Sequence, residues 1–266
     1  MDGLDRTVAE VSGAAQSFLL AATAPERDGF LQAVDPAVKL LGVLTLLVLT
    51  VATDRLLALA GLATLPVGLA IASRLSLRTL GKRVALPLSA SAVIVAPQAL
   101  VQPGPAVFSL TDSLALTAPG LAYVATFLVR VGTCVALLSV LLLTTRFSAL
   151  LAALRRLRVP ALPTTLLAIT HRSLLLFFRE LERMTHARRS RTFTRLSLRE
   201  AWRQTGSFLG TFLLRSLERG ERVQQAARAR GGTRMTPYQR SQTVGVADVG
   251  FGLVVAVTVV VRVIVG

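Results

Sequence analysis

The run "GLAYVATFLVRVGTCVALLSVLLLTT", residues 120–145, contains a single charged residue, Arg130. A helix of about 20 apolar residues can cross about 30 Å of hydrocarbon. A lone strand would leave its backbone groups unpaired in lipid, so helix is favoured. The run therefore predicts a transmembrane helix. A charge inside such a helix is costly, so Arg130 is either a functional residue or a packing arginine bonded to carbonyl oxygens.

Four further apolar runs are long enough, or nearly so, to cross a bilayer: residues 38–53, 56–72, 84–101 and 246–266. The last run is rich in valine, which favours strand in water, but the hydrogen-bonding requirement in lipid favours helix there too. We therefore expect an all-α polytopic membrane protein with about five transmembrane helices. The lipid bilayer is its first expected partner.

The charge is separated from the apolar runs. The chain has a net charge of +16 and a mean hydropathy of +0.62. Residues 144–240 hold twenty arginines and five acidic residues, so this block carries nearly all of the excess. The only cysteine, Cys134, has no disulfide partner, and no His/Cys cluster has metal-site spacing. We expect an apolar part and a basic part, with no metal and no cofactor.

The basic residues of the short loops predict the orientation. Loop 73–83 has four basic residues and no acid, whereas loop 102–119 has no basic residue and one acid, Asp112. The former is therefore expected in the cytoplasm, together with the N-terminus and residues 144–240. The expected domains of this multi-pass plasma-membrane protein are a cytoplasmic N-terminal segment (1–35), four transmembrane helices (36–145), a cytoplasmic or interfacial domain of long amphipathic helices (146–240) and a C-terminal transmembrane helix (246–266).

Two long helices are expected inside the basic block, each running from an apolar start to an arginine-rich end. The second end is stopped by Gly231 and Gly232. At an offset of 39 residues the two ends match at five pairs: Glu182/Glu221, Arg183/Arg222, Ala187/Ala226, Arg189/Arg228 and Arg191/Arg230. This indicates one structural device used twice; the alternative is a chance alignment in an arginine-rich chain.

These ends suit protein docking better than catalysis. Alanine and glycine let another backbone come close, and arginine offers a planar fork of donors for a carboxylate or a helix C-terminus. The chain lacks a phosphate-binding G-x-x-x-x-G-K-[ST] loop, and its two histidines, His171 and His186, stand in no catalytic arrangement. We therefore expect a non-enzymatic protein with no catalytic residue and with protein partners.

Three motifs carry a resemblance to a known family: "DPAVKLLGVL" (35–44), "LLAALRRLRVPALP" (150–163) and "RSLERGERVQQAARARG" (215–231). In this order they resemble the transmembrane T component of energy-coupling factor (ECF) transporters, the CbiQ/EcfT family. The resemblance implies an ABC-type importer in which coupling helices dock by Ala-Arg-Gly ends into two ATPase subunits. It also implies a substrate-binding S component, which selects cobalt, nickel, biotin or another vitamin.

The resemblance places the docking motifs on particular residues. Ala229, Arg230 and Gly231 match the second Ala-Arg-Gly motif. The first motif is degenerate: Ala187, Arg188 and Arg189 keep its Ala-Arg pair, whereas the internal repeat aligns Arg191 with Arg230.

The resemblance also covers the segment before the first span. Asp35, Pro36 and Lys39 match the family there, while Ala37 stands where the family usually has an arginine.

Two other classes of protein remain as alternatives. A membrane-anchored basic protein could bind nucleic acid or anionic lipid through the arginine block, but aromatic residues make up only 5% of the chain and apolar stripes interrupt the arginines. A polytopic enzyme acting on lipid-like substrates would need paired acids near the cytoplasmic face, and the block has no D-x-x-x-D sequence. We expect no nucleic-acid partner.

Overall fold

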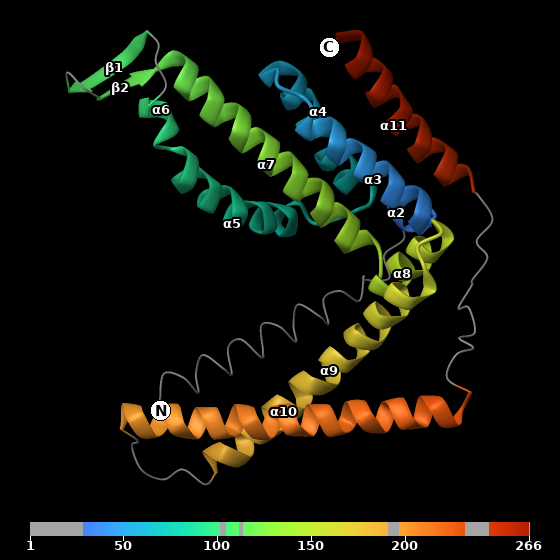
Figure 1. Cartoon of the computed structure of the whole chain (residues 1–266). Coiled ribbons are helices and arrows are strands. Elements are labelled where there is room, and N and C mark those ends of the chain that lie inside the picture. Colours follow the sequence, from blue (N-terminus) through green and yellow to red (C-terminus); the bar gives the residue numbers. More distant parts are fainter. Residues whose placement is uncertain (1–28, 102–104, 112–113, 191–196, 232–244, 266) are drawn as a thin grey trace. The chain divides into compact units, whose positions relative to one another are not determined.

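A computed structural model of the chain describes residues 29–101, 105–111, 114–190, 197–231 and 245–265 (Figure 1). Its contacts divide these residues into two units. The membrane unit comprises the described residues up to Arg158 together with those from Gly245 onward, and the arginine-rich unit comprises those from Val159 to Gly231. The expected N-terminal segment 1–35 is described only from Gly29 onward, where a short helix, α2 (Phe30–Ala33), places Leu31 in the core.

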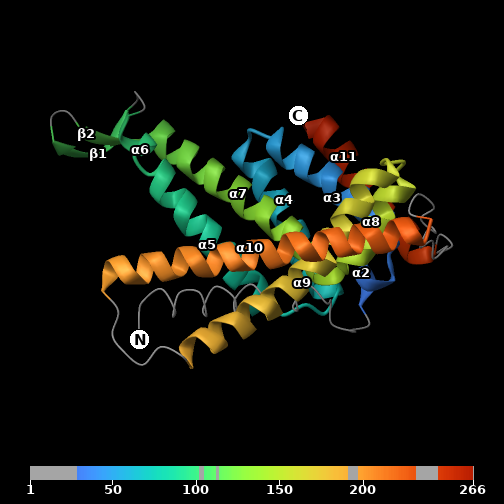
Figure 2. The same cartoon turned by 60° about the horizontal axis from the view of Figure 1, so that its bottom comes forward.

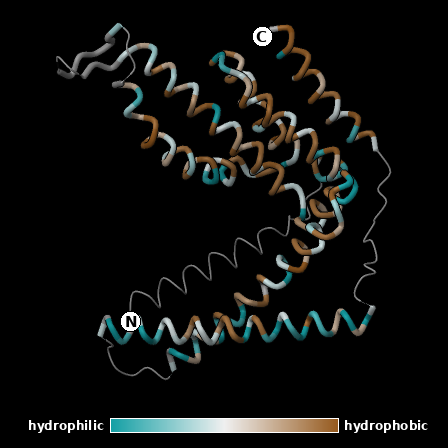
Figure 3. Tube along the Cα trace, in the orientation of Figure 1, coloured by the Kyte–Doolittle hydropathy of each residue, from teal (hydrophilic) through white to brown (hydrophobic). Residues whose placement is uncertain are grey.

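Long helices make up most of the membrane unit. After α2 they are α3 (Pro36–Val51), α4 (Leu56–Ala72), α5 (Leu77–Val95), α6 (Gln98–Val101), α7 (Ala118–Thr144), α8 (Phe147–Arg156) and α11 (Val246–Val265). The central helix is α7, which packs against α3, α4 and α5, while α11 packs against α3. Figure 3 shows hydrophobic residues dominating α7 and α11. The all-α polytopic membrane fold expected from the sequence is confirmed.

Two segments differ in detail from the expectation. The predicted span 84–101 is divided between α5 and α6 at Pro97, because proline removes a backbone donor and disfavours helix in the preceding residue. Helix α5 also begins at Leu77, so it includes basic residues expected in a loop. Part of the predicted loop 102–119 forms an antiparallel hairpin of β1 (Ala106–Thr111) and β2 (Leu114–Thr117).

Among the described residues, three helices are long and apolar enough to cross a membrane: α7, α11 and residues 161–188 of α9 (Ala161–Arg189). Helices α3 and α4 are apolar but shorter, with 16 and 17 residues. From the sequence, α9 was assigned to the cytoplasmic or interfacial block. Its length and composition also suit a membrane span, so this helix is more apolar than a coupling helix in water would need to be.

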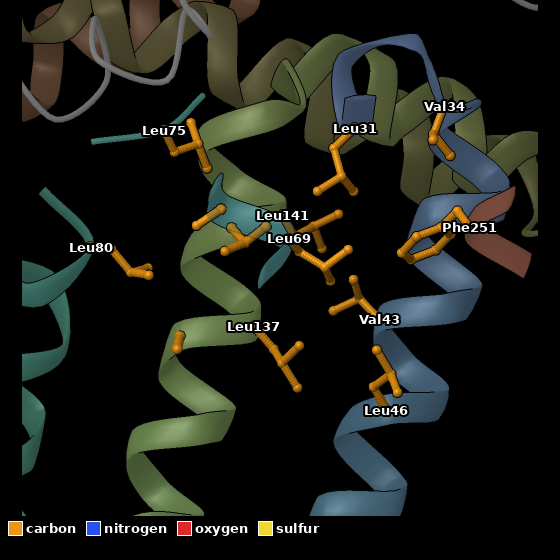
Figure 4. Packing of buried hydrophobic residues seen from close by; sticks show 13 residues of the cluster. Leu31, Val34, Val43, Leu46, Leu69, Leu75, Leu80, Leu137, Leu141 and Phe251 are labelled. Atoms are coloured by element: carbon orange, nitrogen blue, oxygen red, sulfur yellow. The ribbon is translucent and has the colours of Figure 1, made fainter. Parts of the chain in front are cut away.

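Buried apolar side chains of α3, α4, α7 and α11 form the core of the membrane unit (Figure 4). Val43 and Leu46 of α3 meet Leu137 and Leu141 of α7, all nearly inaccessible to solvent. The aromatic ring of Phe251, from α11, lies against α3 at Gly42. A Cβ atom built at Gly42 would lie 2.9 Å from Cζ of Phe251 and closer still to Cε1, so the missing side chain lets the two helices approach.

The arginine-rich unit consists of α9 and the 32-residue α10 (Leu198–Ala229), which cross one another (Figures 1 and 2). Side chains of the described residues join the two helices. The rings of Phe177 and Phe212 meet edge to face at 6.0 Å, and Arg215 donates to Glu180 at 2.7 Å. A further contact places the guanidinium of Arg188 5.3 Å from the ring centre of Phe208.

A capping box starts α10. The backbone N–H of Glu200 donates to the side chain of Ser197, and the Glu200 carboxylate accepts from the Ser197 backbone N–H. Hydrogen bonds from Ser197 to the charged carboxylate lower the pKa of Glu200. The local sequence therefore determines where this helix begins.

Candidate functional site

Ala229, Arg230 and Gly231 form the end of α10. Ala229 is the last helical residue, Arg230 is the C-cap, and Gly231 has a φ of +80°, in the left-handed region. The Gly231 N–H donates to the carbonyl of Arg228 at 3.0 Å, which closes the last turn. Glycine adopts this conformation without strain, so it ends the helix here. All three residues are exposed, and a Cβ built at Gly231 would meet no atom within 4 Å.

The first predicted motif lies at the end of α9. Arg189 is its last helical residue, and the Ser190 hydroxyl donates to the carbonyl of Ala187 at 3.0 Å. Ala187 is exposed, whereas Arg188 is half-buried because its guanidinium lies over Phe208. Arg188 therefore helps to hold α9 against α10. The alternative docking residue, Arg191, lies outside the described residues.

The two helices end in nearly the same register. At the 39-residue offset the C-cap of α9, Ser190, falls on Ala229, one residue before the C-cap of α10. This agreement supports the interpretation that one device is used twice. The two ends differ in their exposed charge, because Arg230 is exposed at the end of α10, whereas Arg188 is half-buried against α10.

The exposed arginines near the end of α10 are available to a partner. Two turns before this end, the exposed pair Arg222–Glu218 is 3.7 Å long, and such a surface pair contributes little to stability. No ion pair or hydrogen bond from the side chain of Arg228 or Arg230 is found within the described part of the chain. This end of α10 therefore presents uncompensated positive charge next to a residue without a side chain.

Asp35 and Pro36, the first residues of the "DPAVK" motif, start α3. The Asp35 side chain accepts a hydrogen bond from the Ala37 N–H at 2.8 Å, which makes it the N-cap, and Pro36 takes the first helical position. The other carboxylate oxygen of Asp35 accepts from Nη1 of Arg156, at the end of α8, at 2.6 Å. The Asp35 N–H donates to the carboxylate of Asp248 in α11.

Lys39, the last residue of that motif, is buried at 1% exposure. Its ammonium donates to the hydroxyl of Thr145 at 3.1 Å and to the carbonyl of Thr144 at 3.4 Å, at the end of α7. Asp248 is buried as well, and it accepts from the N–H of Gly245 at 2.7 Å. The motif thus joins the ends of four helices. The group formed by Asp35, Lys39, Thr144, Thr145, Arg156 and Asp248 is called the Asp35 junction below.

Sequence reasoning found Asp35 and Lys39 but not their partners. Asp248 gave one usable signal, since it is the only acid in the last apolar run. An acid at that position within an apolar helix needs a polar partner. Arg156 lies within the middle motif, residues 150–163, but nothing in the sequence linked it to Asp35.

The side chain of Arg130, from α7, contacts the residues that follow the C-terminal end of α3. Its Nη2 donates to the carbonyl of Thr53 at 2.8 Å and to the carboxylate of Asp54 at 2.9 Å. Arg262, from α11, donates to the Thr53 hydroxyl at 3.0 Å. Cations are favourable at a helix C-terminus, so both arginines stabilise the end of α3. The structure supports the packing interpretation of Arg130.

The amino-acid sequence was compared with protein families and with known proteins. A sequence model of the family described as "CbiQ: Cobalt transport protein" matches residues 28–241. A protein of Methanocaldococcus jannaschii, described as uncharacterized protein MJ1571, is 26% identical over 229 residues, which cover 84% of this chain and 78% of that protein.

Proposed function

Because the chain belongs to the CbiQ family of cobalt transport proteins, we propose that it is the transmembrane T component of an ECF-type ABC importer. In this role it couples ATP hydrolysis by two ATPase subunits to the reorientation of a substrate-binding S component. The chain itself contributes docking surfaces and no catalytic group. The protein acts as a multi-pass component of the plasma membrane, with the arginine-rich unit on the cytoplasmic side.

The observation that carries this proposal is the end of α10. It presents Arg230 without a partner in the described chain, beside Gly231, on a helix 32 residues long. An arginine fork fits a carboxylate or an exposed helix C-terminus, and the absent side chain at 231 lets a partner's backbone approach. The end of α9, with Ala187, Arg189 and Arg191, takes the second ATPase subunit.

Apolar side chains support a second surface, for the S component. Helices α9 and α10 expose large apolar side chains, whose contact with water is unfavourable: Leu162, Leu166, Leu167, Leu209, Leu213, Leu214 and Leu217. Contiguous exposed apolar residues indicate a membrane or protein interface. We propose that an apolar S component packs on these residues. That component selects the transported substrate, for which the family description favours cobalt.

Purification of the tagged chain from a host expressing the neighbouring transporter genes tests the proposal. We expect two ATPase subunits and an S component to co-purify, and the complex to support ATP-dependent uptake in proteoliposomes. Purification with RNA or anionic lipid alone would support the alternative of a membrane-anchored basic protein and contradict the T-component role.

Gly231 offers a sharper prediction. Gly231→Glu should weaken association with the ATPases about tenfold or more, because a side chain is strained at this φ and its carboxylate would lie beside Arg230. Insertion into the membrane should be unchanged, since no atom lies within 4 Å of the added Cβ. The measurement is the ratio of ATPase to tagged chain after purification.

Gly231→Asn is the matched control, because asparagine tolerates the left-handed conformation. If backbone conformation is the main requirement, Gly231→Asn retains more ATPase than Gly231→Glu. Equal loss in both variants would instead show that close approach of the partner is the main requirement. Wild-type stoichiometry in Gly231→Glu would refute the role of Gly231 in docking.

A further inference from the structure

We propose that Asp35 and Arg156 are positioning residues for energy coupling: their ion pair fixes α8 to α3, so that movement of the coupling helices reaches the membrane helices. This inference rests on the proposed function. It assigns the Asp35–Arg156 pair to the transfer of motion, which is a separate task from the docking of ATPases by Arg230.

The position of Arg156 in the chain is the first argument. Arg156 is the last residue of α8, and the boundary between the two units follows two residues later, after Arg158. The next helix, α9, begins at Ala161. Any force that α9 exerts along this connection therefore enters the membrane unit through the end of α8.

The connection is short, because only residues 157–160 separate α8 from α9. Arg158 has a φ of +64°, a left-handed conformation that is unfavourable for residues other than glycine. Pro160 follows, and its ring fixes φ near the observed −50°. Movement of α9 therefore reaches α8 through a short segment in which Pro160 restricts one rotation.

The second argument is that α8 is anchored to α3 at both of its ends. Close to its start, Lys39 of α3 donates to Thr144 and Thr145, which end α7 three and two residues before α8 begins. At its finish, Arg156 holds Asp35, one turn earlier on α3. The two helices also pack against each other between these points. Helix α8 therefore moves with α3 as long as both attachments persist.

The two attachments differ in burial, which is the third argument. Lys39 is 1% exposed, so the first attachment belongs to the core. In the second, the Asp35 side chain is 6% exposed but that of Arg156 is 50% exposed. A half-exposed guanidinium can exchange its carboxylate for water without opening the core, whereas the buried carboxylate favours re-formation of the pair. The Asp35–Arg156 pair is therefore the attachment that a movement of α9 can stretch or break.

Asp35 also connects this ion pair to a second membrane helix, α11. Its N–H donates to Asp248, close to the start of α11, while its side chain caps α3. A displacement of Arg156 thus acts on α3 and α11 together. Both helices contribute to the core of the membrane unit, so the displacement reaches that core.

The test compares Arg156→Gln and Asp35→Asn in the complete complex with its ATPases and S component, reconstituted in proteoliposomes. Asparagine still caps a helix, so Asp35→Asn removes the charge but keeps the start of α3. We expect both variants to co-purify with ATPases at wild-type stoichiometry and to hydrolyse ATP. Substrate taken up per ATP hydrolysed should fall on the order of tenfold in each. The double variant should be no worse than either single variant, because both remove the same contact.

Two further variants calibrate the measurement. Arg78→Gln removes an exposed basic residue at the start of α5, on the side of the membrane predicted to be cytoplasmic, and should leave the ratio unchanged. Arg156→Lys keeps a positive charge and should restore part of the coupling. If Asp35→Asn fails to fold, Arg156→Gln decides, since its side chain is half-exposed.

Three results would overturn the inference. One is an unchanged ratio of uptake to hydrolysis in both single variants. Another is an equal fall in Arg78→Gln. The third is loss of folded protein or of ATPase stoichiometry in all Asp35 and Arg156 variants, which would assign the pair to stability or assembly. Failure of the wild-type chain to bind ATPases would refute the proposed function itself, and so is distinguishable from these results.

Discussion

Removing arginines of both motifs together, by Arg230→Gln combined with Arg189→Gln and Arg191→Gln, should nearly abolish assembly with the ATPases. Each docking site is expected to lose a charge-assisted contact worth about 1.5 to 3 kcal/mol, or roughly ten- to a hundredfold in association. Arg230→Gln alone should therefore weaken one site only. The measurement is ATPase co-purification at increasing salt, together with ATP-driven uptake.

The matched control replaces two other arginines of the same unit, Arg199 and Arg203. Both are exposed near the start of α10, far along the helix from Arg230. Arg199→Gln with Arg203→Gln removes two positive charges, one more than Arg230→Gln, and touches neither motif. If this control loses as much uptake as Arg230→Gln, the arginines act as a general basic surface and the docking mechanism is wrong.

Arg188 requires a separate variant, because its guanidinium lies over the ring of Phe208. Phe208→Leu removes the ring and leaves Arg188 in place. If Arg188 acts by joining α9 to α10, Phe208→Leu and Arg188→Gln should weaken assembly by similar factors, since a cation–π contact contributes about 0.5 to 2 kcal/mol. A loss confined to Arg188→Gln would place Arg188 among the docking residues.

Gly42→Leu is expected to be the most damaging single substitution in the membrane unit. Its side chain would occupy the space of the Phe251 ring, which is completely buried against α3. Overpacking of this kind costs about 1 to 3 kcal/mol or more, and in a bilayer it separates helices that small residues hold close together. We expect a lower melting temperature in detergent and faster proteolysis of α11.

A control and a rescue accompany this prediction. Gly61→Ala, in α4, should be neutral or slightly stabilising, because no atom lies within 4 Å of its added Cβ. Phe251→Ala should also destabilise the protein, by leaving a cavity. Gly42→Leu together with Phe251→Ala should be less damaging than the two losses added together. Strict additivity would show that the two residues do not share one packing site.

Local sequence signals determined most of the secondary structure. The apolar runs predicted the helices, because in lipid a helix alone satisfies its backbone within a single segment. Asp35 with Pro36 marked the start of α3, and Gly231 marked the end of α10, since each acts through the backbone of its own neighbours. The arginine-rich ends of α9 and α10 were equally visible, because their charge depends on composition alone.

Only the tertiary structure decided which helices meet. The partners of Asp35 lie 121 and 213 residues away in the chain, and those of Arg130 lie 76 and 77 residues away. No periodicity or capping signal encodes such pairs, because they depend on how whole helices pack. The close approach of Gly42 to Phe251 was invisible for the same reason, as was the engagement of Arg188 by Phe208. A local motif identifies the groups that need partners, and packing between distant segments selects those partners.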